Sequence, residues 1–216
     1  MSVTEIDLET FPRKEHVRYF SALAYPYVGV TQNIDLTAFL PRIRQRGYPF
    51  FLTFLWCVSA AANAVPELRQ RLSNGKLLQY DFCCTSHTVA RPDGTYCYCT
   101  LDCGKEFDTF LPYAERMQTA ALETGSIEES AEEAQSLIFV SCMPWMSFTA
   151  LIQPVPYPAD SNPRITWGRF TTENGRTQMP VSLLCNHALV DGRHLAEFYA
   201  QLERQLLRFG TQSGLI

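Results

Sequence analysis

The chain reads Leu183-Leu184-Cys185-Asn186-His187-Ala188-Leu189-Val190-Asp191-Gly192-Arg193-His194 near the end of its 216 residues. The apolar run that leads into this stretch predicts a buried strand, and apolar residues that follow Gly192 at helical spacing predict a helix. His187 is therefore expected at a strand-to-helix junction, where a histidine can be held rigidly and still project into a cleft as a general base. The same motif also fits a structural histidine in a buried turn.

Residues 187–194 resemble the active-site signature of the chloramphenicol acetyltransferase family, His-x-x-x-Asp-Gly, which the acyltransferase cores of 2-oxoacid dehydrogenases share more loosely. Two further segments resemble the same family. Residues 11–20 are similar to its N-terminal Arg-Lys-Glu-His-Phe element, and residues 141–145 to its Ser-x-x-Pro-Trp segment. Three separated motifs in the same order make the resemblance specific, and it extends from about Phe11 to about Gln205.

Composition and charge limit the protein class. With 46% hydrophobic and 19% charged residues, the chain is expected to form a single domain over residues 1–216. A net charge of −4 argues against nucleic-acid binding. Met1 to Glu9 lacks the pattern of a signal peptide, so we expect a cytoplasmic protein. The apolar stretch from Pro49 to Val65 is slightly too short to cross a membrane and predicts a buried helix instead.

Eight cysteines do not indicate a disulfide framework or a metal site. The chain is long for a disulfide-stapled domain and shows no secretory signal. Five of the cysteines cluster between Cys83 and Cys103, but their spacing is not that of a structural zinc site. We therefore expect buried free thiols and no metal.

Strand and helix patterns mix without regular alternation, which predicts an α+β fold. No motif for a phosphate-binding loop is present. The resemblance implies the CoA-dependent acyltransferase fold, a large mixed β-sheet flanked by helices, and a homotrimer with active sites between subunits. Helices are expected at 11–20, 36–43, 49–65 and 107–122. Strands are expected at 28–33, 77–80, 87–91, 95–101, 137–140, 164–170 and 178–186, with a loop at 123–133 and an extended connection at 153–163.

The resemblance also implies a reaction, the transfer of an acetyl group from acetyl-CoA, as co-substrate, to a hydroxyl of chloramphenicol or a similar small molecule, as in antibiotic resistance. The resemblance assigns His187 the role of general base and Ser141 that of oxyanion stabiliser. It implies that Arg13 pairs with Asp191 and so supports the geometry of the site. It also implies that Thr166 helps to hold the intermediate through water. The positions near the coenzyme are Trp145, Arg169 and Phe170.

The positions that match the acceptor pocket are Phe20, Val28, Cys97 and Leu151. Phe20 remains aromatic, but the other three stand where the family commonly has phenylalanine or tyrosine, and Gln153 replaces an apolar residue. Because each lost ring removes apolar area, we expect weaker activity on chloramphenicol than in a dedicated resistance enzyme, unless other aromatic residues such as Tyr25, Tyr27, Tyr96 or Tyr98 compensate. Asn186 replaces the first histidine of the family's His-His pair, which leaves the hydrogen bonds beside His187 open.

Two other functions fit the same residues. The protein can be a catalytically silent relative or scaffold, or an acetyltransferase for a different alcohol or amine. A dehydrogenase-type acyltransferase core is disfavoured, because the lipoyl domain and linkers of such chains are absent.

Overall fold

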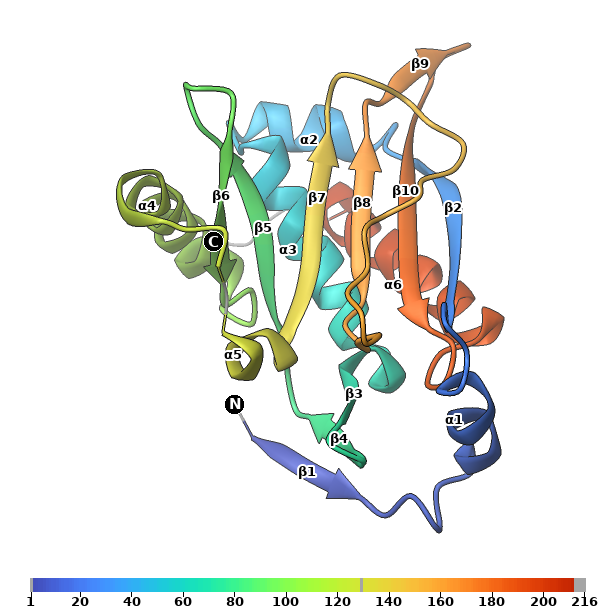
Figure 1. Ribbon diagram of the computed structural model, residues 1–216. Coiled ribbons are helices and arrows are strands. Elements are labelled where there is room, and N and C mark those ends of the chain that lie inside the picture. Colours follow the sequence, from blue (N-terminus) through green and yellow to red (C-terminus); the bar gives the residue numbers. More distant parts are fainter. Residues whose placement is uncertain (1, 129, 212–216) are drawn as a thin grey trace.

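A mixed sheet of seven strands organises the computed structural model, which describes residues 2–128 and 130–211 (Figure 1). Its strands β5, β7 and β8 are parallel to one another, and the other pairs are antiparallel. The predicted α+β class is confirmed. From one edge to the other the strands are β2 (Tyr27–Asp35), β10 (Arg176–Asn186), β8 (Arg164–Gly168), β7 (Leu137–Met143), β5 (Cys84–Ala90) and β6 (Tyr96–Leu101), and β9 (Thr171–Glu173) pairs with β10.

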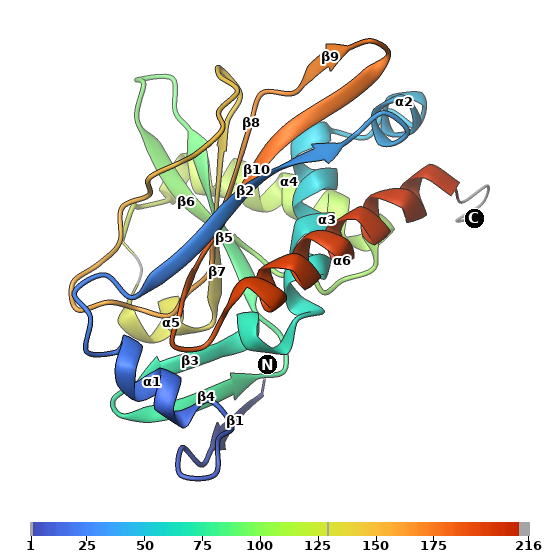
Figure 2. The same ribbon diagram turned by 90° about the vertical axis from the view of Figure 1, so that its right-hand side faces the viewer.

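Helices cover one face of this sheet, as Figure 2 shows from the side. They are α2 (Phe39–Gln45), α3 (Phe50–Asn63), α4 (Phe107–Thr124) and α6 (Gly192–Thr211). Helix α3 packs against α6 on one side, while its Phe51 and Phe54 contact the buried Trp167 of β8 on the other. Burial on several sides explains why this segment is so apolar. Among the described residues, no helix is long and apolar enough to cross a membrane.

A second, small sheet and a short helix lie at the end of the large sheet where β10 finishes (Figure 2). The sheet pairs β1 (Val3–Ile6), β4 (Lys76–Tyr80) and β3 (Gln70–Ser73), and the 3₁₀ helix η1 (Pro66–Arg69) precedes it. Asn74 and Gly75 both have positive φ, 50° and 76°, as the predicted tight turn between β3 and β4 requires. Helix α1 (Lys14–Phe20) is the short N-terminal helix predicted from residues 11–20.

Two local predictions need correction. The stretch expected to be a loop at 123–133 contains the start of helix α5 (Ala131–Gln135), where Ser130 and Glu133 form a capping box. Strand β7 continues through Ser141 to Met143 and ends only at Pro144, because β8 pairs with it along its whole second half. Ser141 is thus a residue within a strand, and not one at a break.

Strand alternation separates the two faces of the large sheet. In β10, Val181, Leu183 and Cys185 are fully buried against the helices, whereas Ser182 and Asn186 point to the opposite face. In this chain the opposite face is crossed by residues 144–163, the yellow-to-orange connection between β7 and β8 in Figure 1. The buried polar side chains of Ser182 and Asn186 therefore lie on the face that has no helices.

All eight cysteines are free, as predicted, and six of them are buried. Burial raises the pKa of the Cys99 thiol to about 11 and that of Cys103 to about 12. At neutral pH these thiols are protonated and act as small apolar groups.

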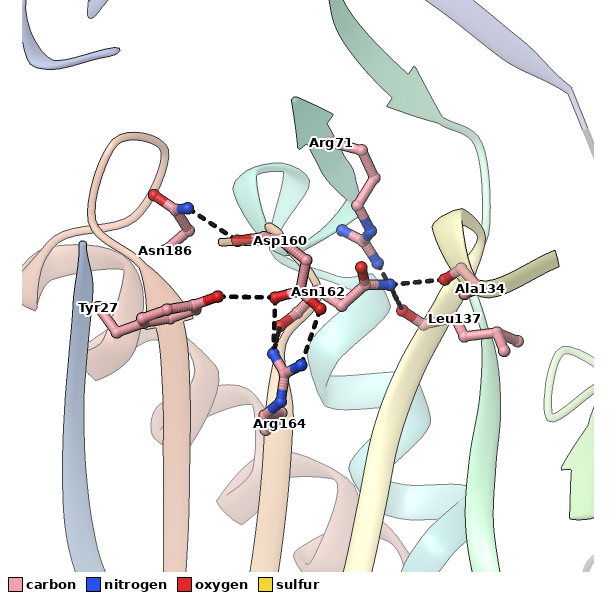
Figure 3. Close-up of polar contacts among 8 residues, drawn as sticks. All are labelled: Tyr27, Arg71, Ala134, Leu137, Asp160, Asn162, Arg164 and Asn186. Carbon is pink, nitrogen blue, oxygen red and sulfur yellow. Dashed lines mark hydrogen bonds and ion pairs between the residues drawn. The ribbon is translucent and has the colours of Figure 1, made fainter. Parts of the chain in front are cut away.

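Arg71 connects the small sheet to the large one from a fully buried position. Its guanidinium donates to the main-chain oxygens of Leu68, Gln70 and Leu137 at 2.9, 2.7 and 2.8 Å. Leu137 is the first residue of β7, so Arg71 joins β3 to the start of the strand that carries Ser141 (Figure 3).

Replacement of Arg71 by methionine should destabilise the protein strongly. The carbonyl of Leu137 would keep its hydrogen bond from Asn162, but those of Leu68 and Gln70 would lose the charged donor, and each unsatisfied group costs about 1–3 kcal/mol. We expect the free energy of unfolding in urea to fall by about 2–6 kcal/mol. Arg176→Met is the matched control, since Arg176 is 68% exposed in its ion pair with Asp35 and should change stability by less than about 1 kcal/mol. Equal effects of the two substitutions would contradict the structural role of Arg71.

Candidate active site

His187 follows the last residue of β10 and is held at both its main chain and its ring. Its N–H donates to the oxygen of Pro26 at 2.7 Å, and Nδ1 lies 2.8 Å from the oxygen of Val190. Because a carbonyl only accepts, Nδ1 carries the proton and Nε2 is left as the basic nitrogen; this tautomer follows from the contact. The ring of Phe20 stacks on the imidazole with centroids 4.1 Å apart. The ring is thus held in an orientation that suits the predicted role of base at Nε2.

Asn186 uses both ends of its amide. Its Oδ1 accepts from the N–H of Ala188 at 3.0 Å, and its Nδ2 donates to the main-chain oxygen of Asp160 at 2.8 Å. The hydrogen bonds that the sequence left open beside His187 are therefore made, and Asn186 ties the turn to the connection between β7 and β8.

Arg13 and Asp191 form the predicted ion pair. Nη1 of Arg13 lies 2.5 Å from Oδ2 of Asp191, with the side chains 16% and 36% exposed. The second carboxylate oxygen accepts from the N–H of Arg193 at 3.0 Å. Burial raises the pKa of Asp191, but the hydrogen bond from Arg13 and the nearby His194 outweigh it, so the pKa is lowered overall. Asp191 is occupied in this way, while Nδ1 of His187 bonds a carbonyl instead.

Ser141 and Thr166 lie side by side in β7 and β8, on the face without helices. Both line a cavity of about 460 Å³, and so do Leu151 and Gln153. The hydroxyl of Thr166 donates to Oε1 of Gln153 at 3.2 Å. The predicted oxyanion donor therefore opens onto a space that fits a small molecule.

The structure does not bring His187 and Ser141 together. Ser182 of β10 is aligned with Thr166, and Thr166 with Ser141, whereas His187 lies five residues beyond Ser182. With a rise of about 3.4 Å per residue and strands about 4.8 Å apart, the Cα atoms of His187 and Ser141 are roughly 15–20 Å apart. Figure 1 shows the same separation, since β10 ends beside α1, away from the arrowheads of β7 and β8. A single chain therefore does not place the two groups around one reacting centre, which the predicted base and the predicted oxyanion donor must each reach at hydrogen-bond distance.

A second cavity of about 870 Å³ adjoins the first, and Ser141 lines both. The three positions predicted near the coenzyme all lie here. Apolar side chains dominate its wall, together with two arginines. The predicted residues are Trp145, Arg169 and Phe170, and the lining also includes Phe50, Phe51, Tyr96, Arg91 and Met143.

The residues predicted to line the acceptor pocket lie in different parts of the structure. Leu151 lines the cavity with Ser141, but Phe20 lies at His187, and Val28 packs against the core. The prediction for Cys97 is wrong: its thiol is fully buried and 3.1 Å from the oxygen of Ala121 in α4. Strand alternation explains the error, because residues on either side of Cys97 face the opposite way.

Tyr96 and Tyr98, two of the four tyrosines named from the sequence as a compensation for lost rings, line this cavity. Strand alternation in β6 explains their position, since neighbours of the helix-facing Cys97 face the opposite way. Sequence reasoning missed other residues of the cavity, which no sequence signal marked because they meet only through the sheet. The missed lining residues are Phe139, Ile152 and Arg164. Over residues 2–128 and 130–211, no group of three or more His, Cys, Asp or Glu is placed to hold a metal ion.

Comparison with known proteins points to one family. The family model described as chloramphenicol acetyltransferase matches residues 1–203. A chloramphenicol acetyltransferase of Proteus mirabilis is 25% identical over 210 residues, with 94% of each chain covered. One from Klebsiella sp is 28% identical over 213 residues, covering 93% of this chain and 92% of the relative.

Solved structures give the same relationship. A chloramphenicol acetyltransferase is 27% identical and has a TM-score of 0.87, covering 95% of this chain and 100% of that one. The dihydrolipoamide acetyltransferase of Azotobacter vinelandii shares the fold at 20% identity, with a TM-score of 0.64 over 87% of this chain and 84% of that one. Since the family model spans nearly the whole sequence and the fold agrees, this chain belongs to the chloramphenicol acetyltransferase family of acetyl-CoA-dependent acyltransferases.

Proposed function

We propose that the protein transfers an acetyl group from acetyl-CoA to a hydroxyl of chloramphenicol or a similar small molecule. The observation that carries this proposal is the hydrogen bond from Nδ1 of His187 to the oxygen of Val190, which leaves Nε2 as a neutral base. A silent relative would not need this tautomer. If chloramphenicol is the acceptor, the protein contributes to antibiotic resistance.

In the proposed reaction, Nε2 of His187 takes the proton of the acceptor hydroxyl as that oxygen bonds to the thioester carbonyl carbon. The hydroxyl of Ser141 donates a hydrogen bond to the oxyanion that forms. The tetrahedral intermediate then collapses, the carbon–sulfur bond breaks, and the thiolate leaves with the proton from His187. The products are the acetyl ester and free CoA, and no acyl-enzyme forms.

We further propose that the chain works as a homotrimer, each chain folding as one domain, with active sites between subunits. The separation of His187 from Ser141 supports this arrangement, because one copy supplies the base and the next supplies the oxyanion donor. In a cyclic assembly the same contact repeats around the ring and closes. Each chain then contributes to two different sites.

The second cavity suits the coenzyme. Its apolar wall, including Trp145 and Phe170, fits the uncharged arm of CoA, while Arg91 and Arg169 supply positive charge for its phosphates. Ser141 lies where the two cavities meet, so a thioester that reaches through one cavity meets an acceptor in the other.

The role proposed for Thr166 is modified by its neighbour. Its hydroxyl proton is engaged by Gln153, a residue that stands where the family has an apolar side chain. A water bound at Thr166 must then donate to the hydroxyl, and not accept from it.

Catalysis by His187 is tested with acetyl-CoA and chloramphenicol by release of the CoA thiol. His187→Ala should lower kcat by about 10²- to 10⁴-fold, the range for a positioned base, without loss of the fold. His16→Ala, which replaces an exposed histidine of α1, is the control and should retain full activity. We expect a KM for chloramphenicol above about 10 μM, because aromatic contacts are fewer. No thiol release with chloramphenicol or with a panel of other alcohols and amines would reject the proposed function.

The shared site is tested by mixing two inactive variants. Ser141→Ala alone should lower kcat by about 10²- to 10³-fold. When His187→Ala and Ser141→Ala chains are unfolded together in equal amounts and refolded, about one quarter of the sites in cyclic trimers should receive both intact residues. We therefore expect about a quarter of wild-type activity. Activity that stays at the level of the separate variants would show that each site lies within one chain.

The Arg13–Asp191 pair should support stability in a pH-dependent manner. The folded pKa of Asp191 lies below its unfolded value of about 4, so its contribution is present above that pH and is lost as pH falls through the folded pKa. At pH 7, Asp191→Asn should cost about 1–3 kcal/mol and lower kcat, whereas the difference in Tm from wild type should shrink toward pH 3. Glu197→Gln, in an exposed ion pair with Arg204, is the control. Full stability at pH 7 with lost activity would assign Asp191 a direct part in the chemistry.

A further inference from the structure

The turn that carries His187 is connected to a buried polar network on the face without helices. Figure 3 shows Asn186 reaching from the end of β10 to the main-chain oxygen of Asp160. Asp160 belongs to the connection between β7 and β8, so this single hydrogen bond joins the turn to a segment distant in sequence. Asn186 is only 5% exposed, which means that water does not replace these partners.

Asp160 is itself held firmly. Both of its carboxylate oxygens accept from the guanidinium of Arg164, at 2.8 and 2.7 Å, in a two-pronged ion pair. The hydroxyl of Tyr27 donates to the same carboxylate at 2.9 Å. Burial and the carboxylate raise the pKa of Tyr27, so this hydroxyl remains a donor. The carbonyl that Asn186 binds is therefore a fixed point relative to β8.

The other end of the Asn186 amide shapes the turn. Its Oδ1 accepts from Ala188, and its own carbonyl accepts from the N–H groups of Leu189 and Val190 at 3.2 and 3.0 Å. These contacts fix the direction of the next peptide units. The oxygen of Val190 then points at Nδ1 of His187, 2.8 Å away. A turn that relaxed would move this oxygen and release the ring.

We propose that Asn186 is a positioning residue for His187, and that it works from the anchor made by Asp160 and Arg164. By holding the turn, it keeps the proton on Nδ1 and the basic nitrogen at Nε2. This inference rests on the proposed function for its effect on turnover, but its effect on the tautomer stands apart from the reaction. It gives a structural role to Asn186, which replaces the first histidine of the family's His-His pair.

The experiment measures the protonation state of the His187 ring directly. Imidazole ¹⁵N spectra distinguish a protonated Nδ1 from a protonated Nε2, and the chain has only four histidines. The signals of His187 are assigned from their absence in His187→Gln. Spectra are compared for wild type, Asn186→Ala and Asn186→Asp; the last keeps an acceptor for Ala188 but loses the donor to Asp160.

Tyr27→Phe is the matched control, because it removes one hydrogen bond of the same network, while the two hydrogen bonds from Arg164 still hold Asp160 and the Asn186 amide keeps both of its partners. Circular dichroism and thermal melting are recorded for every variant. The kcat and the KM for acetyl-CoA are measured with chloramphenicol as acceptor.

We expect wild type and Tyr27→Phe to show a protonated Nδ1, and both Asn186 variants to show a mixture of the two tautomers. Their kcat should fall by about 10- to 100-fold, the scale of a misplaced reacting group, while KM for acetyl-CoA changes by less than about threefold. Folded Asn186 variants that retain the Nδ1 proton and nearly full kcat would overturn the inference, as would failure of both variants to fold. A wild type without turnover would reject the proposed function only, because the tautomer comparison still decides the role of Asn186.

Discussion

The register of β10 against β8 is the constraint on which the site depends. It aligns Ser182 with Thr166 and thereby leaves His187 beyond the end of the pairing, at the opposite end of the sheet from the cavities around Ser141. A shift of one residue would turn Val181, Leu183 and Cys185 away from the helices, so the core itself fixes the register. The proposed base and the proposed oxyanion donor are therefore kept apart by the same packing that stabilises the fold. This separation is the structural reason for proposing a site shared between copies.

The two faces of the sheet are stabilised by different kinds of interaction. The face with helices is mainly apolar, although the buried His87 lies there against Phe51 and Gln118, and its cysteines are protonated and act as apolar groups. The other face buries charged side chains, which cost free energy unless they are fully bonded. Arg164 and Asp160 meet this condition through their two-pronged pair, and Asn162 does so by donating to the oxygens of Ala134 and Leu137 at 2.6 and 2.8 Å (Figure 3). The connection between β7 and β8 is held down by these contacts.

This chain differs from the usual residues of its family at several positions of the candidate site. Asn186 replaces a histidine, yet both ends of its amide are bonded. Gln153 replaces an apolar residue and engages the hydroxyl of Thr166. Tyr96 and Tyr98 line the cavity and partly restore the aromatic surface that Cys97 was expected to lack. The cavity that we propose for the acceptor is therefore more polar beside Thr166 than the family's pattern implies.

The sequence by itself determined the α+β class, the main elements and the pairing of Arg13 with Asp191, because these follow from local periodicity and from motifs that the family shares. Local patterns also placed His187 after a buried strand. Only the tertiary structure decided that His187 and Ser141 are far apart, that Cys97 faces α4, and that Asn186 reaches Asp160. These facts depend on strand register and on which face of the sheet a residue occupies. Register arises from packing between segments distant in the chain, which no local pattern encodes.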